Sequence, residues 1–168
     1  MTHTTTHPNS LLMEIRALIE DARHQVAHAA NAGLTIAYWR IDKRLLRENL
    51  TDGRGDYGQK ILASLAQQLE LEYGKGFSYL DLTRMGRFAE LFPDERILVS
   101  LIQELTWTHF IALLPLKDPL AREFYAEMCR VERWSVRILR QKINGMLFER
   151  TALSKNSEEV VRQDDMVY

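Results

Sequence analysis

Cysteine is almost absent from this chain of 168 residues, in which Cys129 is the single example. A lone thiol excludes a disulfide within the chain and a cysteine-rich zinc site, and it is typical of a reducing compartment. Long apolar runs are absent too, since no stretch approaches the roughly 18 to 20 residues that span a bilayer. No charged-then-apolar secretory leader opens the chain. We therefore expect a cytoplasmic protein with no membrane partner.

An excess of charge of either sign is also missing, because 22 basic and 23 acidic residues leave a net charge of −1. No global field attracts nucleic acid, so a nucleic-acid surface would have to come from local clustering. The sequence also lacks a glycine-rich phosphate loop, a nucleophile elbow and a cluster of metal ligands. These absences argue against an enzyme in its own right, and we expect no cofactor and no metal.

Alternating strand patterns are missing as well, while apolar residues recur at helical spacing along most of the chain. The sequence therefore predicts an all-α fold, a multi-helix single domain, in keeping with 46% hydrophobic and 27% charged residues. We expect a disordered tail over 1–9, a helical domain over 10–153 and a linker or C-terminal tail over 154–168.

The segment from Tyr57 to Phe92 predicts a helix, a tight turn and a second helix. The first helix carries an inward stripe of Ile61, Leu62, Leu65, Leu69 and Tyr73. Gly74 can take the left-handed conformation that ends a helix. Ser78 is a good N-cap, and Asp81 three residues later completes a pair that resembles a capping box.

The second helix of this pair should end before Pro93 and expose a polar face. Its predicted inner stripe is Leu82, Met85, Phe88, Ala89 and Phe92, and its outer face carries Tyr79, Thr83, Arg84 and Arg87. Such a face can read DNA, as the second helix of a helix-turn-helix does. An ordinary helical hairpin with a solvated face is the alternative, because Asp81 and Glu90 balance the two arginines.

Before this pair we expect two helices separated by a break or kink at Asn31–Gly33. The first, capped by Ser10, would bury Ile15, Leu18, Ile19, Ala22, Val26 and Ala29. The second carries a basic group that leads into a loop over Thr51–Gly58, namely Arg40, Lys43, Arg44 and Arg47. This corner is either a phosphate contact or a solvated face. His24 and His28 have the spacing of a metal pair but no third ligand, so we expect them to be exposed.

After Pro93 the caps predict four further helices. They begin after Asp94, Thr106, Asp118 and Ser135, and the last runs from Val136 to Arg150. Six basic and two acidic residues lie between Arg130 and Arg150. Arg137, Arg140 and Lys142 would contact the DNA backbone. We expect Phe88, Trp107 and Leu139 to share one core, because each lies on the apolar stripe of a different helix.

Several ordered motifs carry a family resemblance over about residues 11–153. They are Tyr38-Trp39-Arg40-Ile41, Asp56-Tyr57-Gly58, Tyr73-Gly74-Lys75-Gly76-Phe77-Ser78, Leu105-Thr106-Trp107-Thr108-His109, Asp118-Pro119 with Phe124-Tyr125, and Trp134-Ser135-Val136-Arg137 with Leu139, Gln141 and Ile143. The chain resembles the N-terminal domain of the YhcG family, mostly bacterial proteins that look like PD-(D/E)XK nucleases. Asp42 departs from the pattern, because the family tends to have glycine there.

The resemblance implies a helical module that precedes a nuclease domain. We expect the catalytic half to be missing from this sequence, because the sequence shows no pattern of a strand pair and no Asp/Glu-x-Lys triplet to hold Mg²⁺. Two functions follow. The first is a module that binds duplex DNA and targets a PD-(D/E)XK nuclease domain. The second is a protein-interaction or dimerisation module, with a possible homodimer and no direct contact with DNA.

Overall fold

The computed structural model describes residues 8–48 and 55–164, with side chains for 9–48 and 55–155. This part of the chain contains helices and no strand, which confirms the all-α prediction. The helices are α1 (Pro8–Arg47), α2 (Asp56–Tyr73), the short 3-10 helix η1 (Lys75–Phe77), α3 (Tyr79–Leu91), α4 (Glu95–Leu101), α5 (Trp107–Leu113), α6 (Pro119–Glu132), α7 (Val136–Asn144) and α8 (Leu147–Asp164).

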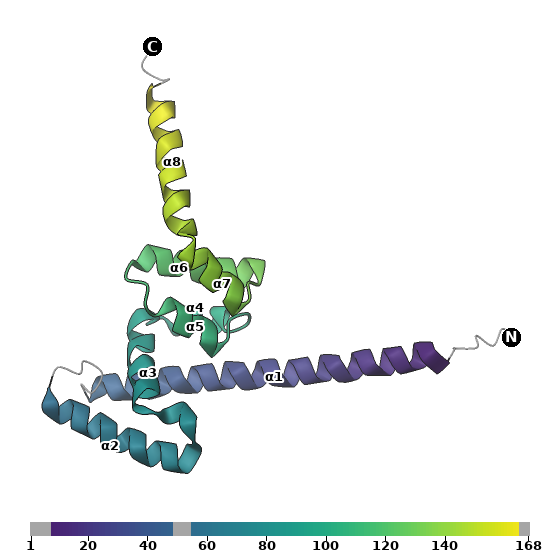
Figure 1. Ribbon diagram of the computed structural model, residues 1–168, viewed down its shortest axis with the longest axis vertical. Coiled ribbons are helices and arrows are strands. Elements are labelled where there is room, and N and C mark those ends of the chain that lie inside the picture. The colour runs from purple at the N-terminus through teal and green to yellow at the C-terminus, as the bar shows by residue number, and fades with distance from the viewer. Residues whose placement is uncertain (1–7, 49–54, 165–168) are drawn as a thin grey trace.

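The helices form a body from which two long helices project (Figure 1). The C-terminal part of α1 packs against α3, and α2 and η1 lie beside α3. α4 to α7 form the other part of the body, and α6 and α7 contact the start of α8. The N-terminal half of α1 and the far end of α8 extend away from this body (Figure 1).

The turn between α2 and α3 forms as its residues predict. Gly74 ends α2 with a φ of 91°, a left-handed value that favours glycine. Ser78 then caps α3, because its hydroxyl accepts from the Asp81 N–H at 3.3 Å. The predicted inner stripe of α3 is entirely buried. The order of helix, turn and helix is therefore confirmed, whereas likeness to a DNA-binding helix-turn-helix stays a prediction.

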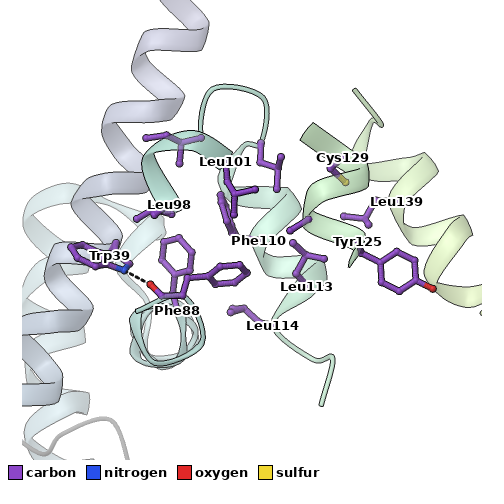
Figure 2. Close-up of a cluster of buried hydrophobic side chains, with 14 of the residues drawn as sticks. Trp39, Phe88, Leu98, Leu101, Phe110, Leu113, Leu114, Tyr125, Cys129 and Leu139 are labelled. Carbon is purple, nitrogen blue, oxygen red and sulfur yellow. Dashed lines mark hydrogen bonds between the residues drawn. The ribbon is translucent and has the colours of Figure 1, made fainter. Parts of the chain in front are cut away.

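One core joins helices from both parts of the body (Figure 2). Phe88 of α3, Phe110 of α5 and Leu139 of α7 are completely buried in it. Trp107 is half-buried and packs against this cluster, with its ring centroid 5.1 Å from that of Phe88. Trp39 of α1 donates from Nε1 to the Phe92 carbonyl at 2.8 Å. The predicted common core of Phe88, Trp107 and Leu139 is thus confirmed.

Near the N-terminus the structure corrects two predictions. α1 is one uninterrupted helix, so the break expected at Asn31–Gly33 does not occur, and Ser10 lies inside the helix instead of capping it. A single glycine costs a helix only about 1 kcal/mol, which the neighbouring alanines and leucine can offset. The stripe expected to be buried between Ile15 and Ala29 is exposed throughout.

Other boundaries and faces also differ from the predictions. The last predicted helix is divided by Gly145 and Met146, whose φ is 52°, into α7 and α8. The predicted loop at Thr51–Gly58 ends early, because Asp56 already begins α2, and residues 51–54 lie outside the described part. α8 continues past Ser154 to Asp164, while the assignment of residues 154–168 as a linker or C-terminal tail stays a prediction. Tyr73, predicted on the inward stripe of the first helix of the pair, is 68% exposed at the C-terminal end of α2.

Candidate nucleic-acid interface

The outer side of α3 holds four of the predicted site residues, which we call the α3 face: Tyr79, Thr83, Arg84 and Arg87. Tyr79 is 44% exposed and Arg87 is exposed, whereas Thr83 and Arg84 are half-buried. The Thr83 hydroxyl donates to the Tyr79 carbonyl at 2.8 Å, which fixes its rotamer. Because the opposite side of α3 is buried, these side chains are presented outward by a well-packed helix.

Carboxylates lie next to the cations of the α3 face. Arg84 forms an ion pair with Asp81 at 3.6 Å. The Ser78 hydroxyl donates to the same carboxylate at 2.6 Å. Glu90 is exposed one helical turn beyond Arg87. The α3 face is therefore close to electrically neutral and offers hydrogen-bonding and stacking groups more than net charge.

Lys60 of α2 adds a cation beside the α3 face that sequence reasoning missed. It lines a shallow hollow of about 360 Å³ together with Tyr79, Asp56, Gln59 and Ala63. Lys60 and Tyr79 are 19 positions apart and meet only because the turn folds α3 back beside α2. No local pattern in the sequence could have shown this proximity.

Asp42 of α1 attaches α3 to the rest of the body. Its side chain is completely buried, and its Oδ2 accepts from the Ala89 N–H of α3. Its Oδ1 is buried with no hydrogen-bond partner among the described residues. Burial raises the pKa of Asp42 to about 7, although backbone N–H groups act in the opposite direction. Asp42 thus contacts the backbone of the helix that carries the α3 face.

The other three predicted residues lie on α7, and we call them the α7 face: Arg137, Arg140 and Lys142. All three are exposed, and the nine residues of α7 include no acidic side chain. Lys142 Nζ lies 5.6 Å from the centroid of the Trp134 ring, a cation–π contact. The α7 face therefore concentrates positive charge, as the sequence predicts for this region.

His109 of α5 positions the residues that lead into α7. Its Nδ1 accepts from the Thr106 N–H at 3.1 Å, so its Nε2 carries the proton and donates to the Trp134 carbonyl at 2.8 Å. Burial lowers the pKa of His109, because the charged imidazolium is poorly solvated there. Both ring nitrogens of His109 are thus occupied by hydrogen bonds within the fold, which is typical of a structural histidine.

The structure does not merge the α3 face and the α7 face into one surface. α3 packs against α1, α2 and η1, whereas α7 packs against α5, α6 and α8. The two helices meet only through the shared core of Phe88 and Leu139. The α3 face and the α7 face therefore lie on different helices of the described part of the chain, and they differ in charge.

Two other parts of the described surface are less suited to nucleic acid. In the basic group of α1, Arg44 pairs with Glu48, and Lys43 lies 4.8 Å from the Trp39 ring centroid. A hollow of about 630 Å³ between α3, α4 and α6 is lined by four carboxylates that repel phosphate: Glu90, Asp94, Glu123 and Glu127.

The described residues contain no group of three His, Cys, Asp or Glu side chains that could hold a metal ion. His24 and His28 are exposed, and the Nε2 of His28 bonds to the Gln103 carbonyl. Within the same residues, no helix has the length and apolar character to cross a membrane.

Comparison with known proteins identifies the family to which this chain belongs. The family model described as the DUF1016 N-terminal domain matches residues 14–150. The Escherichia coli (strain K12) protein named "Putative nuclease YhcG" is 27% identical over 176 residues, which cover 87% of this chain and 47% of the relative. The chain thus spans about half the length of that relative. No solved structure matches. With most of its length matched, the chain belongs to the family of DUF1016 N-terminal domains.

Proposed function

We propose that this chain is the DNA-binding, targeting module of a PD-(D/E)XK-type nuclease and that duplex DNA lies against the α3 face. The observation that carries the proposal is the position of Tyr79, Thr83 and Arg87 on the outward side of α3, directly after a tight turn. Side chains in the first turns of a helix are the ones that reach base edges when the helix enters a major groove. The nuclease name of the E. coli relative supports a nucleic-acid context.

The α7 face supplies the second half of the proposal. Arg137, Arg140 and Lys142 are exposed cations on a helix without acids. Phosphate contacts need only positioned positive charge and carry no sequence information. We assign backbone contact to the α7 face and base contact to the α3 face, with Lys60 as an additional phosphate contact beside Tyr79.

Phosphodiester cleavage is assigned to a separate PD-(D/E)XK domain, which this module would position. Metal-dependent cleavage needs carboxylates fixed around Mg²⁺, and the described residues hold no such group. The test is to incubate the purified chain with supercoiled DNA in Mg²⁺ and in Mn²⁺. DNA should remain intact; metal-dependent nicking that copurifies with the chain would contradict this assignment.

A protein-interaction or dimerisation module is the second candidate, and one observation favours it. The N-terminal half of α1 exposes a series of apolar side chains, among them Leu18 at 70% and Val26 at 71%. Exposed apolar surface of this kind marks an interaction site more often than a solvated one. As a module without DNA contact it is an alternative to the DNA proposal, although these apolar residues belong to neither the α3 face nor the α7 face.

Fluorescence anisotropy with a labelled duplex tests the DNA proposal. The wild-type chain should bind, and unlabelled duplex should compete better than unlabelled single strand. The double variant Arg84→Ala/Arg87→Ala should weaken binding about tenfold or more, because each lost charged contact costs about 1–3 kcal/mol. Arg96→Ala/Lys117→Ala is the matched control, because both residues are exposed and lie on neither face. Equal loss in the two double variants would contradict the proposal.

A further inference from the structure

The hollow of about 630 Å³ between α3, α4 and α6 has a largely apolar lining. Its apolar residues come from the end of α3, from α4 and from α6, among them Leu91, Phe92, Ile97, Leu101, Pro119 and Ala126. Phe92, Leu101 and Ala126 are buried, whereas Ile97 is 57% exposed. The volume lies in the range of protein binding clefts, roughly 300–1,000 Å³. The exposed isoleucine therefore offers apolar surface that a partner can cover.

Four carboxylates also line this hollow, which we call the acidic hollow: Glu90, Asp94, Glu123 and Glu127. Asp94 caps α4, because its Oδ1 accepts from the Arg96 N–H at 2.8 Å. Glu90 and Glu123 are exposed, and neither forms an ion pair within the described part of the chain. Arg87 lies one helical turn before Glu90 without pairing with it. Two exposed carboxylates of the acidic hollow thus lack a cationic partner among the described residues.

The cations of α6 near the acidic hollow have other partners. Arg122, which also lines the hollow, is buried and donates to the Leu116 carbonyl at 2.7 Å. Arg130 donates from Nε to the Glu127 carboxylate at 2.9 Å. The positive charge of Arg130 is thus matched by one of the four carboxylates, and that of Arg122 is held inside the fold. The acidic hollow is therefore complementary to a partner that brings both apolar side chains and cations.

The backbone where α3 ends at the acidic hollow is already hydrogen-bonded within the fold. The Phe92 N–H donates to the Phe88 carbonyl, and the Phe92 carbonyl accepts from Trp39 Nε1 at 2.8 Å. Pro93 has no N–H, and its carbonyl accepts from Lys43 Nζ at 3.5 Å. Most other lining residues lie in helices, where backbone groups bond within the helix. A bound segment must therefore satisfy its own backbone groups, as an amphipathic helix in a groove does.

The length of the acidic hollow suits a short helix. On α6 its lining extends from Pro119 to Glu127, roughly 12 Å at 1.5 Å per residue, which is about two turns of a helix. We propose that the acidic hollow binds an amphipathic helix of a partner protein. Its apolar side chains would cover Ile97, and its lysines or arginines would pair with Glu90 and Glu123. This surface includes no residue of the α3 face or of the α7 face.

Backbone amide chemical shifts of the isotope-labelled chain, measured without DNA, test the proposal. The probe is a synthetic alanine-rich helical peptide with leucines at i and i+4 on one side and lysines on the other. It should shift the amide signals of Ile97, Leu101 and Ala126. Two control peptides, one with glutamate for lysine and one with alanine for leucine, should bind about tenfold more weakly. A lysine peptide that shifts no signal, or only signals away from the acidic hollow, would overturn the proposal.

Charge reversal tests the electrostatic part. Glu90→Lys/Glu123→Lys should raise the dissociation constant of the lysine peptide about tenfold or more, because each reversal replaces an attraction by a repulsion. The same variant should prefer the glutamate peptide. Glu70→Lys/Glu72→Lys is the matched control, since it changes the net charge equally at two exposed positions of α2. Equal loss in the two double variants, with helicity intact, would reduce binding to net charge and contradict the proposal.

Substitution of the exposed isoleucine tests the apolar part. Ile97→Ser should weaken binding of the lysine peptide about tenfold, because the apolar surface that the leucines cover is lost. The variant should still fold, since Ile97 is more than half exposed. Leu71→Ser, at a position of α2 that is 81% exposed, is the control and should leave binding unchanged. Unchanged binding by Ile97→Ser would overturn the proposal. Since no step includes DNA, failure here leaves the DNA proposal to its own test.

Discussion

The α3 face and the α7 face differ in what they offer to a nucleic acid. α7 carries three exposed cations and no acid, whereas the arginines of α3 lie near Asp81 and Glu90. A surface of the first kind attracts phosphate over a distance that salt screens, and it is indifferent to sequence. A surface of the second kind gains little from net charge and depends on hydrogen bonds made at close range. Under the DNA-binding proposal, α7 would attract the phosphate backbone and α3 would read the bases.

The two helices also differ in what holds them. α3 is attached to α1 through Asp42, a buried carboxyl whose pKa is raised to about 7. The segment before α7 is attached to α5 through His109, a buried imidazole whose pKa is lowered. Burial favours the uncharged form of both groups. Asp42 becomes charged when it loses its proton as the pH rises, whereas His109 becomes charged when it gains a proton as the pH falls. The attachments of α3 and α7 should therefore weaken at opposite ends of the pH range.

The largest expected effect comes from removing the core anchor beneath each face. Phe88→Ala should lower the free energy of unfolding by about 3–5 kcal/mol and Leu139→Ala by about 2–5 kcal/mol, because both side chains are completely buried. Urea unfolding followed by circular dichroism measures both. Leu71→Ala is the control, since Leu71 is 81% exposed, and it should change stability by less than about 0.5 kcal/mol. A loss below about 1 kcal/mol at Phe88 would show that α3 is not anchored as described.

The next largest effect is the pH dependence of stability at Asp42, which should be opposite to that at His109. The pKa of Asp42 is higher in the folded chain than in the unfolded chain, so folding favours the protonated carboxyl. Its contribution to the free energy of unfolding is therefore complete below pH 3.8 and is lost as the pH rises through about 7. Asp42→Asn should therefore stabilise the chain at pH 8 by about 2–4 kcal/mol and have little effect near pH 4. Thermal unfolding at several pH values measures the difference. Glu72→Gln, an exposed change of the same charge, is the control. A pH-independent difference for Asp42→Asn would contradict the account.

His109 should give the opposite dependence with a smaller effect. Its lowered pKa means that the neutral ring contributes stability that is present above the usual pKa of 6.5 and is lost as the pH falls. His109→Asn should cost about 1–3 kcal/mol at pH 8, because it leaves the Trp134 carbonyl or the Thr106 N–H unpaired. The cost should shrink toward pH 5, where the wild-type chain is itself destabilised. His24→Asn, at an exposed position, is the control.

Local chemistry made the region around α3 predictable from sequence. Gly74, Ser78 and the apolar stripe from Leu82 to Phe92 each act within one or two helical turns, so their consequences follow from spacing alone. The caps at Asp94 and Asp118 follow for the same reason, and the structure places both as expected. Such local patterns do not show which helix each of these segments packs against.

The helical period of apolar residues predicted burial incorrectly in the N-terminal half of α1. The apolar residues from Ile15 to Ala29 have the spacing of a buried helix face, yet the structure leaves them exposed, because periodicity does not say whether another helix of the fold reaches that face. Gly145 was overlooked as the point where α7 ends, although glycine is a common helix terminator. Lys60, beside Tyr79, and Asp42, beneath Ala89, depend on contacts between distant segments, which a single sequence does not show.

The salt dependence of DNA binding tests the central claim, that the α3 face and the α7 face both contact duplex DNA in different ways. Log affinity should fall linearly with log salt for the wild-type chain. Arg137→Ala/Arg140→Ala/Lys142→Ala should flatten that slope by about 2–3, since each phosphate contact contributes about 0.9. Arg84→Ala/Arg87→Ala should lower affinity at every salt concentration while changing the slope by about 1 or less. A slope and affinity unchanged in both variants, with helicity intact, would contradict the account.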